Sequence, residues 1–184
     1  EEQGLTDYIL GRLGIDAPDK DLKGWREFLD RILYSQETVR IALVGKYTEL
    51  TDAYLSHNEA FHHAGADLKT KVEIRYFDSE LVEKNGITRD LACCDGILIP
   101  GGFGSRGTEG KIATARFARE KGIPFLGVCL GFQIATIEIA RDMLGMADAN
   151  STEIKPDCGY PVIDILPEQK AVLTMGGTMR LGSQ

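Results

Sequence analysis

The sequence contains no apolar run near the roughly 20 residues that a membrane-spanning helix needs. Its first ten residues, EEQGLTDYIL, have neither the basic start nor the apolar stretch of a signal peptide, so we expect none. Basic residues are outnumbered, 21 against 28 acidic, and the net charge of −7 argues against a nucleic-acid or membrane partner. The hydrophobic content of 43% is ordinary for a soluble globular domain.

Cysteine is also sparse, and its spacing excludes two common uses. Cys93, Cys94, Cys129 and Cys158 form no Cys-x-x-Cys pair, and no other residues stand at ligand spacing from them. We therefore expect neither a disulfide framework nor a metal site. Free thiols of this kind fit a reducing cytoplasm, which is the predicted location.

What the sequence does contain, from residue 38 onward, is an alternation of short apolar strands and helices. The pattern predicts strands at 39–44, 72–77, 95–100 and 123–128, with helices between them, the first stopping near Gly65. This order predicts an α/β fold: a doubly wound, mostly parallel sheet, flavodoxin-like, with helices on both faces. The tail predicts two more strands, at 162–166 and 171–173, running antiparallel.

Two short helices are predicted ahead of the sheet. Leu5, Ile9 and Leu13 share one helical face that ends at Gly14. A second helix carries an apolar stripe, which usually packs in a core or against another domain: Leu22, Trp25, Phe28, Leu29, Ile32 and Leu33. The predicted organisation is therefore a helical linker at 1–36 and one domain at 37–184.

The chain is organised around residues 123–145, where a strand predicted to be buried (123–128), the turn Gly-Val-Cys-Leu-Gly and a helix follow one another. This layout is typical of a nucleophile elbow, which holds the residue at its apex, here Cys129, on a strained backbone. The flanking Gly127 and Gly131 avoid crowding in the turn, and the helix N-terminus favours a thiolate. The alternative is an inert core cysteine.

The Gly-Gly-Phe-Gly turn at 101–104 also follows a predicted strand. It has three interpretations: a phosphate-binding turn, a plain turn, or an oxyanion hole. In the third, a glycine N–H and the N–H of Leu130, directly after the cysteine, would stabilise a negatively charged oxygen.

Five stretches resemble the class I glutamine amidotransferase domains of the CTP synthase family. They are GKYTELTDAY at 45–54, PGGFGSRGTEG at 100–110, GVCLGFQ at 127–133, DANSTE at 148–153 and MGGTMRLG at 175–182. The resemblance covers nearly the whole chain, and residues 1–35 resemble the linker that follows the amidoligase domain in that family.

The resemblance implies a role for individual residues. Cys129 is the nucleophile that attacks the carboxamide of L-glutamine, giving a γ-glutamyl thioester and ammonia. Gly102 and Leu130 form the oxyanion hole, and the carboxylate of Glu153 holds the α-amino group of glutamine. The residues implied to line the glutamine site are Gly102, Leu130, Gly131, Phe132, where the family more often has Met, Gln133 and Glu153.

The resemblance also implies partners. Phe103, Arg106, Gly107 and Glu109 match a loop that the family links to activation by GTP, although a surface salt bridge would also explain its charges. Ammonia passes to an amidoligase domain that uses ATP and Mg²⁺ to convert UTP to CTP, in pyrimidine nucleotide biosynthesis. The glutaminase domain itself needs no cofactor, and the complete enzymes are homotetramers.

One departure from the family is important. The family completes a Cys-His-Glu triad near its C-terminus, whereas the only histidines here are His57, His62 and His63, expected on the surface of one helix. The family arginine that contacts the glutamine carboxylate is missing as well. We therefore expect a truncated domain that is inactive alone. Two alternatives stay open: a non-catalytic partner-binding fragment and a stand-alone γ-glutamyl cysteine hydrolase.

Overall fold

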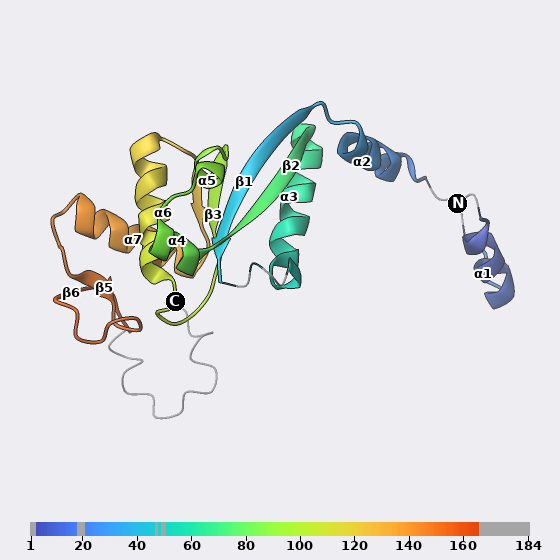
Figure 1. Ribbon diagram of the computed structural model, residues 1–184. Coiled ribbons are helices and arrows are strands. Elements are labelled where there is room, and N and C mark those ends of the chain that lie inside the picture. The colour runs from blue at the N-terminus through green and yellow to red at the C-terminus, as the bar shows by residue number, and fades with distance from the viewer. Residues whose placement is uncertain (1–2, 18–20, 47, 49–50, 166–184) are drawn as a thin grey trace, which may run out of the picture.

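The computed structural model describes residues 3–17, 21–46, 48 and 51–165 (Figure 1). Within them, four parallel strands form one sheet in the order β2-β1-β3-β4. Their bounds are Glu37–Gly45 for β1, Thr70–Asp78 for β2, Gly96–Ile99 for β3 and Phe125–Gly127 for β4. The predicted parallel α/β fold is confirmed.

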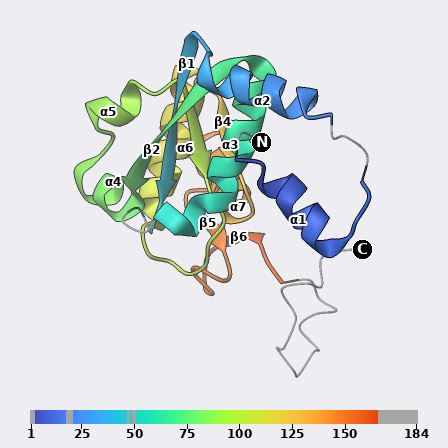
Figure 2. The same ribbon diagram turned by 90° about the vertical axis from the view of Figure 1, so that its right-hand side faces the viewer.

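Helices cover both faces of this sheet (Figures 1 and 2). Helix α3 (Leu55–Leu68), which follows the short 3₁₀ turn η1 (Thr51–Tyr54), lies on one face. The other face is covered by α4 (Ser79–Asn85), α6 (Thr108–Lys121) and α7 (Leu130–Asp142). The short helix α5 (Arg89–Ala92) leads into β3. Each face of the sheet has its own hydrophobic core, and alternate residues of β1 point into one or the other. Ala42 and Val44 pack towards α6 and α7, and Leu43 packs towards α3.

Local chemistry explains how α4 begins and why α3 contains a glycine. The Asp78 carboxylate caps α4 by accepting the N–H groups of Glu80 and Leu81 at 2.7 and 3.3 Å. The prediction that the first helix stops near Gly65 is wrong, because α3 continues to Leu68. A Cβ at Gly65 would lie 2.5 Å from the carbonyl oxygen of Thr70, so this glycine permits close packing instead of ending the helix.

Two strand predictions need correction. The strand before the cysteine is not fully buried: Leu126 is 56% exposed, because β4 is an edge strand of the described sheet. The predicted strand at 162–166 is β6 (Tyr160–Ile163), which starts two residues earlier and pairs in parallel with β5 (Ala149–Ser151). The strand predicted at 171–173 lies outside the described residues.

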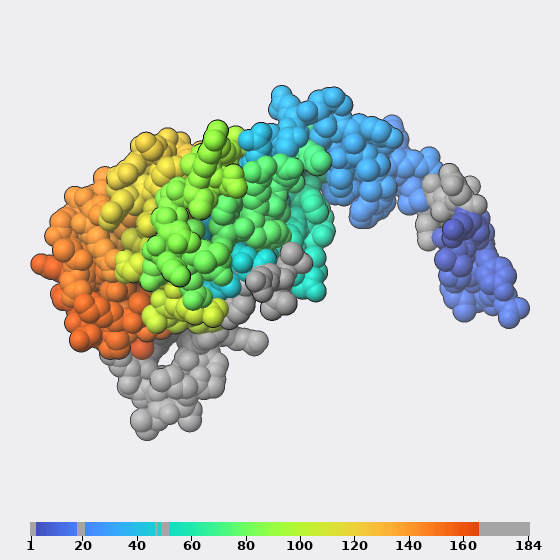
Figure 3. Space-filling view, in the orientation of Figure 1, coloured from blue at the N-terminus to red at the C-terminus, as the bar shows by residue number. Residues whose placement is uncertain are grey.

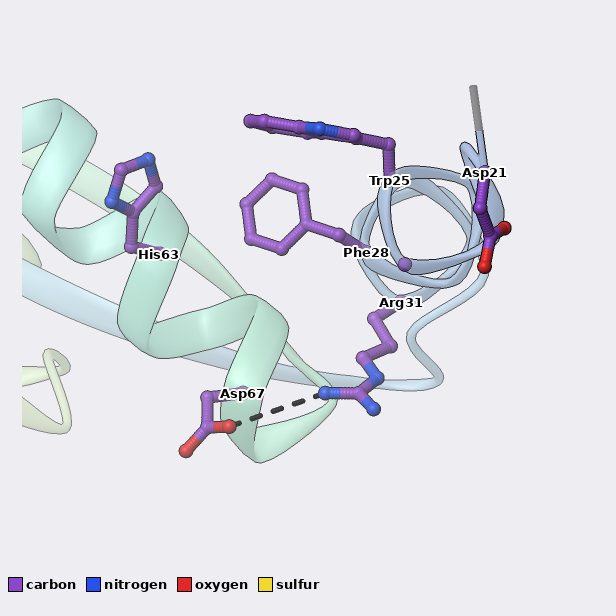
Figure 4. A pocket seen from close by; sticks show the side chains of 7 residues that line it. Asp21, Trp25, Phe28, Arg31, His63 and Asp67 are labelled. Atoms are coloured by element: carbon purple, nitrogen blue, oxygen red, sulfur yellow. Dashed lines mark ion pairs between the residues drawn. The ribbon is translucent and has the colours of Figure 1, made fainter. Parts of the chain in front are cut away.

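The N-terminal helices, α1 (Leu5–Leu13) and α2 (Lys23–Leu33), extend from the sheet as an arm (Figures 1 and 3). Helix α2 rests on α3 through the rings of Phe28 and His63, 5.7 Å apart, and through an Arg31–Asp67 ion pair (Figure 4). Its apolar stripe is not core, since Trp25 is 68% exposed. Among the described residues, no helix is long and apolar enough to cross a bilayer.

Candidate active site

The turn between β4 and α7 places Cys129 on the strained backbone expected of an elbow. Its φ of 54° and ψ of −106° fall where side chains are rarely accommodated, and its thiol is exposed. Hydrogen bonds hold the turn on both sides, from Val128 N–H to Ile99 O at 3.0 Å and from Gly131 N–H to Val128 O at 2.9 Å. The cysteine is therefore presented at the carboxyl end of the sheet.

The two glycines that flank this cysteine are required by close contacts. A Cβ at Gly127 would lie 2.5 Å from the carbonyl group of Gly131, and a Cβ at Gly131 would lie 2.0 Å from the carbonyl oxygen of Ile99. Distances under 3 Å to backbone atoms cannot be relieved by moving a side chain. The elbow therefore seats the first turn of α7 directly on β3.

Two backbone N–H groups beside the thiol are available as donors. The carbonyl of Cys129 accepts the N–H groups of Phe132 and Gln133 at 3.1 and 3.2 Å. By contrast, no acceptor among the described residues takes the N–H of Leu130 or of Gly102. Both N–H groups can serve a developing oxyanion.

The glycine turn at 101–104 lies against the elbow. An ideal Cβ on Gly101 would stand 3.5 Å from Cys129 Cβ, and one on Gly102 would stand 3.5 Å from Leu130 Cδ2. The Lys46 ammonium, from the end of β1, donates to the carbonyl of Phe103 at 2.5 Å. This position beside the thiol favours the oxyanion-hole interpretation over a plain turn.

Glu153 contacts the same glycine turn. Its Oε1 accepts the N–H of Gly104 at 3.4 Å, and its own N–H donates to Ser151 Oγ at 3.2 Å. Ser151 is the last residue of the buried strand β5, so the backbone that carries the exposed Glu153 carboxylate is anchored to this strand. The structure thus brings Cys129, the glycine turn and Glu153 into one locale.

The remaining residues predicted for the glutamine site belong to the first turn of α7. Leu130 and Gly131 are buried, Gln133 is half-buried and Phe132 is 66% exposed. Phe132 thus presents an apolar ring at the surface in the first turn after Cys129. The assignment of these residues to glutamine binding stays a prediction.

The predicted effector loop is an ordered turn into α6. Arg106 Nε pairs with Glu80 Oε1 at 2.8 Å, and Phe103 is exposed. Gly107 precedes α6 with φ of 65°, and Glu109 in the first turn pairs with Arg141 at 2.9 Å. The charges are therefore engaged in ion pairs, as the salt-bridge interpretation expects, and an effector role stays a prediction.

Lys111 is a buried cation that the sequence reasoning missed. It is 2% exposed, and burial, reinforced by the positive charges of Lys46 and Arg106 and opposed by Asp78, lowers its pKa to about 8. Burial and Arg106 also lower the pKa of Lys46. A signal was present, because Lys111 shares the inward helical face with the alanines four and seven residues further on.

The three histidines all lie in α3, across the sheet from α7, and none contacts Cys129 in the described structure. The prediction of surface positions holds for His62 and His63, which are exposed, and only in part for His57, which is half-buried. The His57 ring packs edge-on against Tyr54, with centroids 6.1 Å apart, and its buried Nδ1 has no hydrogen-bond partner among the described residues.

The other thiols lie elsewhere. Burial raises the pKa of the Cys94 thiol, which donates to the carbonyl of Asp90. No group of His, Cys, Asp and Glu in the described part of the chain could hold a metal ion. A groove of about 650 Å³ lies between α2 and α3 and is lined by Trp25, Phe28 and His63 (Figure 4). Helix α2 lies away from α7, so this groove is separate from the elbow (Figure 1).

Comparisons with known proteins identify the family of this chain. The family model for class-I glutamine amidotransferases matches residues 49–184. A CTP synthase from Methanopyrus kandleri is 50% identical over 100% of this chain and 35% of its own length. One from Desulfitobacterium hafniense is 54% identical over 98% of this chain and 34% of its own length.

A solved structure is similar as well. It is described as the glutaminase domain of Trypanosoma brucei CTPS with bound acivicin. It shares 43% identity and a TM-score of 0.64, over 70% of this chain and 50% of that one. The chain spans about a third of the length of the curated relatives it matches.

Proposed function

Because the chain belongs to the class I glutamine amidotransferase family, we propose that it is a glutaminase domain that releases ammonia from L-glutamine. The observation that carries this proposal is the elbow itself: an exposed thiol at φ 54°, at the N-terminus of α7, near two backbone N–H groups that no described residue accepts. An inert core cysteine would need neither the strained backbone nor the exposure.

In the proposed reaction, the Cys129 sulfur attacks the side-chain carboxamide carbon of glutamine. The C–N bond breaks, the nitrogen leaves as ammonia after taking up a proton, and a γ-glutamyl thioester stays on the sulfur. Water then hydrolyses the thioester to glutamate. The N–H groups of Gly102 and Leu130 stabilise the negative oxygen in both steps, an effect that is typically worth 10²–10³-fold in rate per donor.

Glu153 is proposed to hold the substrate by its α-amino group. Its carboxylate accepts the N–H of Gly104 in the glycine turn, and an ammonium group needs an anionic partner of this kind. The acivicin bound to the similar Trypanosoma brucei domain supports a ligand site in this fold.

We further propose that the chain serves a cytoplasmic CTP synthase, a ligase that forms a C–N bond. There, ammonia from this domain would aminate UTP on a separate amidoligase domain, which would bind the ATP and Mg²⁺. Two features support this: the names of relatives about 50% identical, and the exposed apolar side chains of α1 and α2, which suit contact with another domain. Activation by GTP and homotetramer formation belong to the same proposal.

Residues 1–184 alone are proposed to hydrolyse glutamine poorly. None of the three histidines contacts Cys129 in the described structure, and general-base help is worth roughly 10²–10⁴-fold. The same observation favours, as a second candidate, a non-catalytic domain that only binds a partner. Ammonia release by the complete polypeptide, measured beside that of residues 1–184, separates the two candidates.

The decisive test is Cys129→Ala in the complete polypeptide. The substitution removes one exposed sulfur and leaves the glycines, β4 and α7, so the fold should persist. Glutamine-dependent CTP formation should disappear, whereas formation from added ammonia should stay within about twofold of the unsubstituted enzyme. Continued turnover with glutamine would contradict the nucleophile assignment. Parallel loss of both activities in a folded protein would contradict the proposed division of labour.

A further inference from the structure

Arg141, near the end of α7, joins three elements that lie around the candidate glutamine site. Its Nε donates to the carbonyl of Ala149 at 2.7 Å, and its Nη1 donates to both carboxylate oxygens of Glu109 at 3.0 and 2.9 Å. The side chain is 16% exposed, so the guanidinium is largely enclosed. Arginine suits this position because its planar fork satisfies two acceptors at once.

The two partners of Arg141 lead to Glu153 by separate routes. Ala149 begins β5, the strand whose last residue, Ser151, accepts the N–H of Glu153. Glu109 lies in the first turn of α6, directly after the loop in which Gly104 donates to the Glu153 carboxylate. The Glu153 carboxylate is therefore held by two segments that are fastened to one guanidinium.

These contacts form a closed ring. It runs from α7, which also carries the thiol at its N-terminus, through Arg141 to β5 and Glu153, then across Gly104 to Glu109 and back. We propose that Arg141 is a positioning residue that sets the distance between the Glu153 carboxylate and the Cys129 thiol. It contacts neither the thiol nor Glu153, and it acts through Ala149 and Glu109. This inference rests on the proposed glutaminase function.

The test measures binding to the complete polypeptide carrying Cys129→Ala, which cannot turn glutamine over. Two ligands are compared by calorimetry: L-glutamine and 4-carbamoylbutanoate, which is glutamine without its α-amino group. Adding Arg141→Met should weaken L-glutamine binding at least tenfold and leave the affinity for 4-carbamoylbutanoate within twofold of that of the Cys129→Ala parent. The selectivity arises because only the amino group needs the carboxylate of Glu153 in place.

Two companion variants keep the test decisive even if Arg141→Met folds badly. Glu109→Gln removes the charge from one arm of the ring at a 55% exposed side chain, and it should weaken L-glutamine by about threefold with the same selectivity. Arg116→Met is the matched control, because it breaks an ion pair between α6 and Asp142 of α7 that lies outside the ring. It should leave the dissociation constants of both ligands within twofold of those of the Cys129→Ala parent.

The outcomes separate the two proposals. If the parent Cys129→Ala protein does not bind L-glutamine, the proposed function is overturned and the inference with it. If the parent binds L-glutamine but the Arg141 and Glu109 variants bind it equally well, or lose both ligands in parallel, the positioning role is overturned and the glutaminase proposal stands.

Discussion

Gly131 and Ile99 touch so closely that a Cβ on the glycine would stand 2.0 Å from the carbonyl oxygen of the isoleucine. The same carbonyl accepts the N–H of Val128 at 3.0 Å. The centre of the sheet and the start of α7 are therefore fixed to each other on both sides of Cys129. The position of the thiol therefore depends on this contact.

Gly131→Ala should therefore destabilise the domain strongly, by roughly 3 kcal/mol or more, because a backbone oxygen cannot move aside. Glutamine-dependent activity should fall with it. Gly24→Ala in α2 is the matched control, since nothing lies within 4 Å of its position, and it should raise stability by up to about 1 kcal/mol. Urea unfolding of both variants gives the comparison, and equal stability would contradict the contact.

The strained backbone of Cys129 gives a second prediction. Cys129→Gly and Cys129→Ala both remove the thiol, but only glycine is relaxed at φ 54° and ψ −106°. Cys129→Gly should therefore unfold at a higher urea concentration than Cys129→Ala. Its free energy of unfolding should be higher by on the order of 1 kcal/mol. The reverse order would mean that the elbow is not strained in solution.

Much of this site could be predicted from the sequence because its signals are local. The order of strand, glycine, cysteine, glycine and helix placed Cys129 at the apex, and the structure shows why Gly127 and Gly131 must lack side chains. The exposure of Leu126 could not be predicted, because an apolar run does not reveal whether its strand is central or at the edge.

Long-range polar contacts were also beyond the sequence. Arg141, Glu109 and Ala149 come from three elements, and nothing local in their sequence reveals that one guanidinium joins them. The half-buried position of His57 has a related cause, because the His57 ring packs on Tyr54, which contacts Gly45 at the end of β1. Such features depend on tertiary packing, which overrides the pattern of a single helix.

The ion pair between α6 and α7 gives a third prediction. Glu138 is 2% exposed and receives Arg119 through Nε at 3.0 Å and Nη2 at 2.7 Å. Arg119→Met leaves a buried carboxylate without its partner and should cost about 3–5 kcal/mol. The double variant Arg119→Met/Glu138→Met should be clearly more stable than Arg119→Met alone. Additive losses in the double-mutant cycle would contradict a coupled pair.

Lys111 gives a prediction about pH. Its pKa falls from the usual 10.5 to about 8, with burial as the main cause, Lys46 and Arg106 adding to it and Asp78 opposing it. Between these two values the unfolded chain binds more protons than the folded one, so the free energy of unfolding should rise with pH across that window. Near pH 7 the amine is charged in both the folded and the unfolded state. The cost of burying this charge then lowers the free energy of unfolding by its full amount, on the order of 3 kcal/mol.

Lys111→Met should therefore stabilise the protein at pH 7 by up to that amount, because an apolar chain of similar length fills the same buried space without a charge. The gain should shrink as the pH rises from about 8 towards 10.5, where the wild-type amine becomes neutral in both states. Urea unfolding at pH 7 and pH 9.5 gives the free energy of unfolding of wild type and variant at each pH. Subtracting one protein from the other at the same pH cancels the contributions of other groups that titrate in this range. Lys23→Met, at a 79% exposed side chain on α2, is the control and should show no such pH dependence. A loss of stability at pH 7 would mean that the buried ammonium makes a stabilising contact in solution.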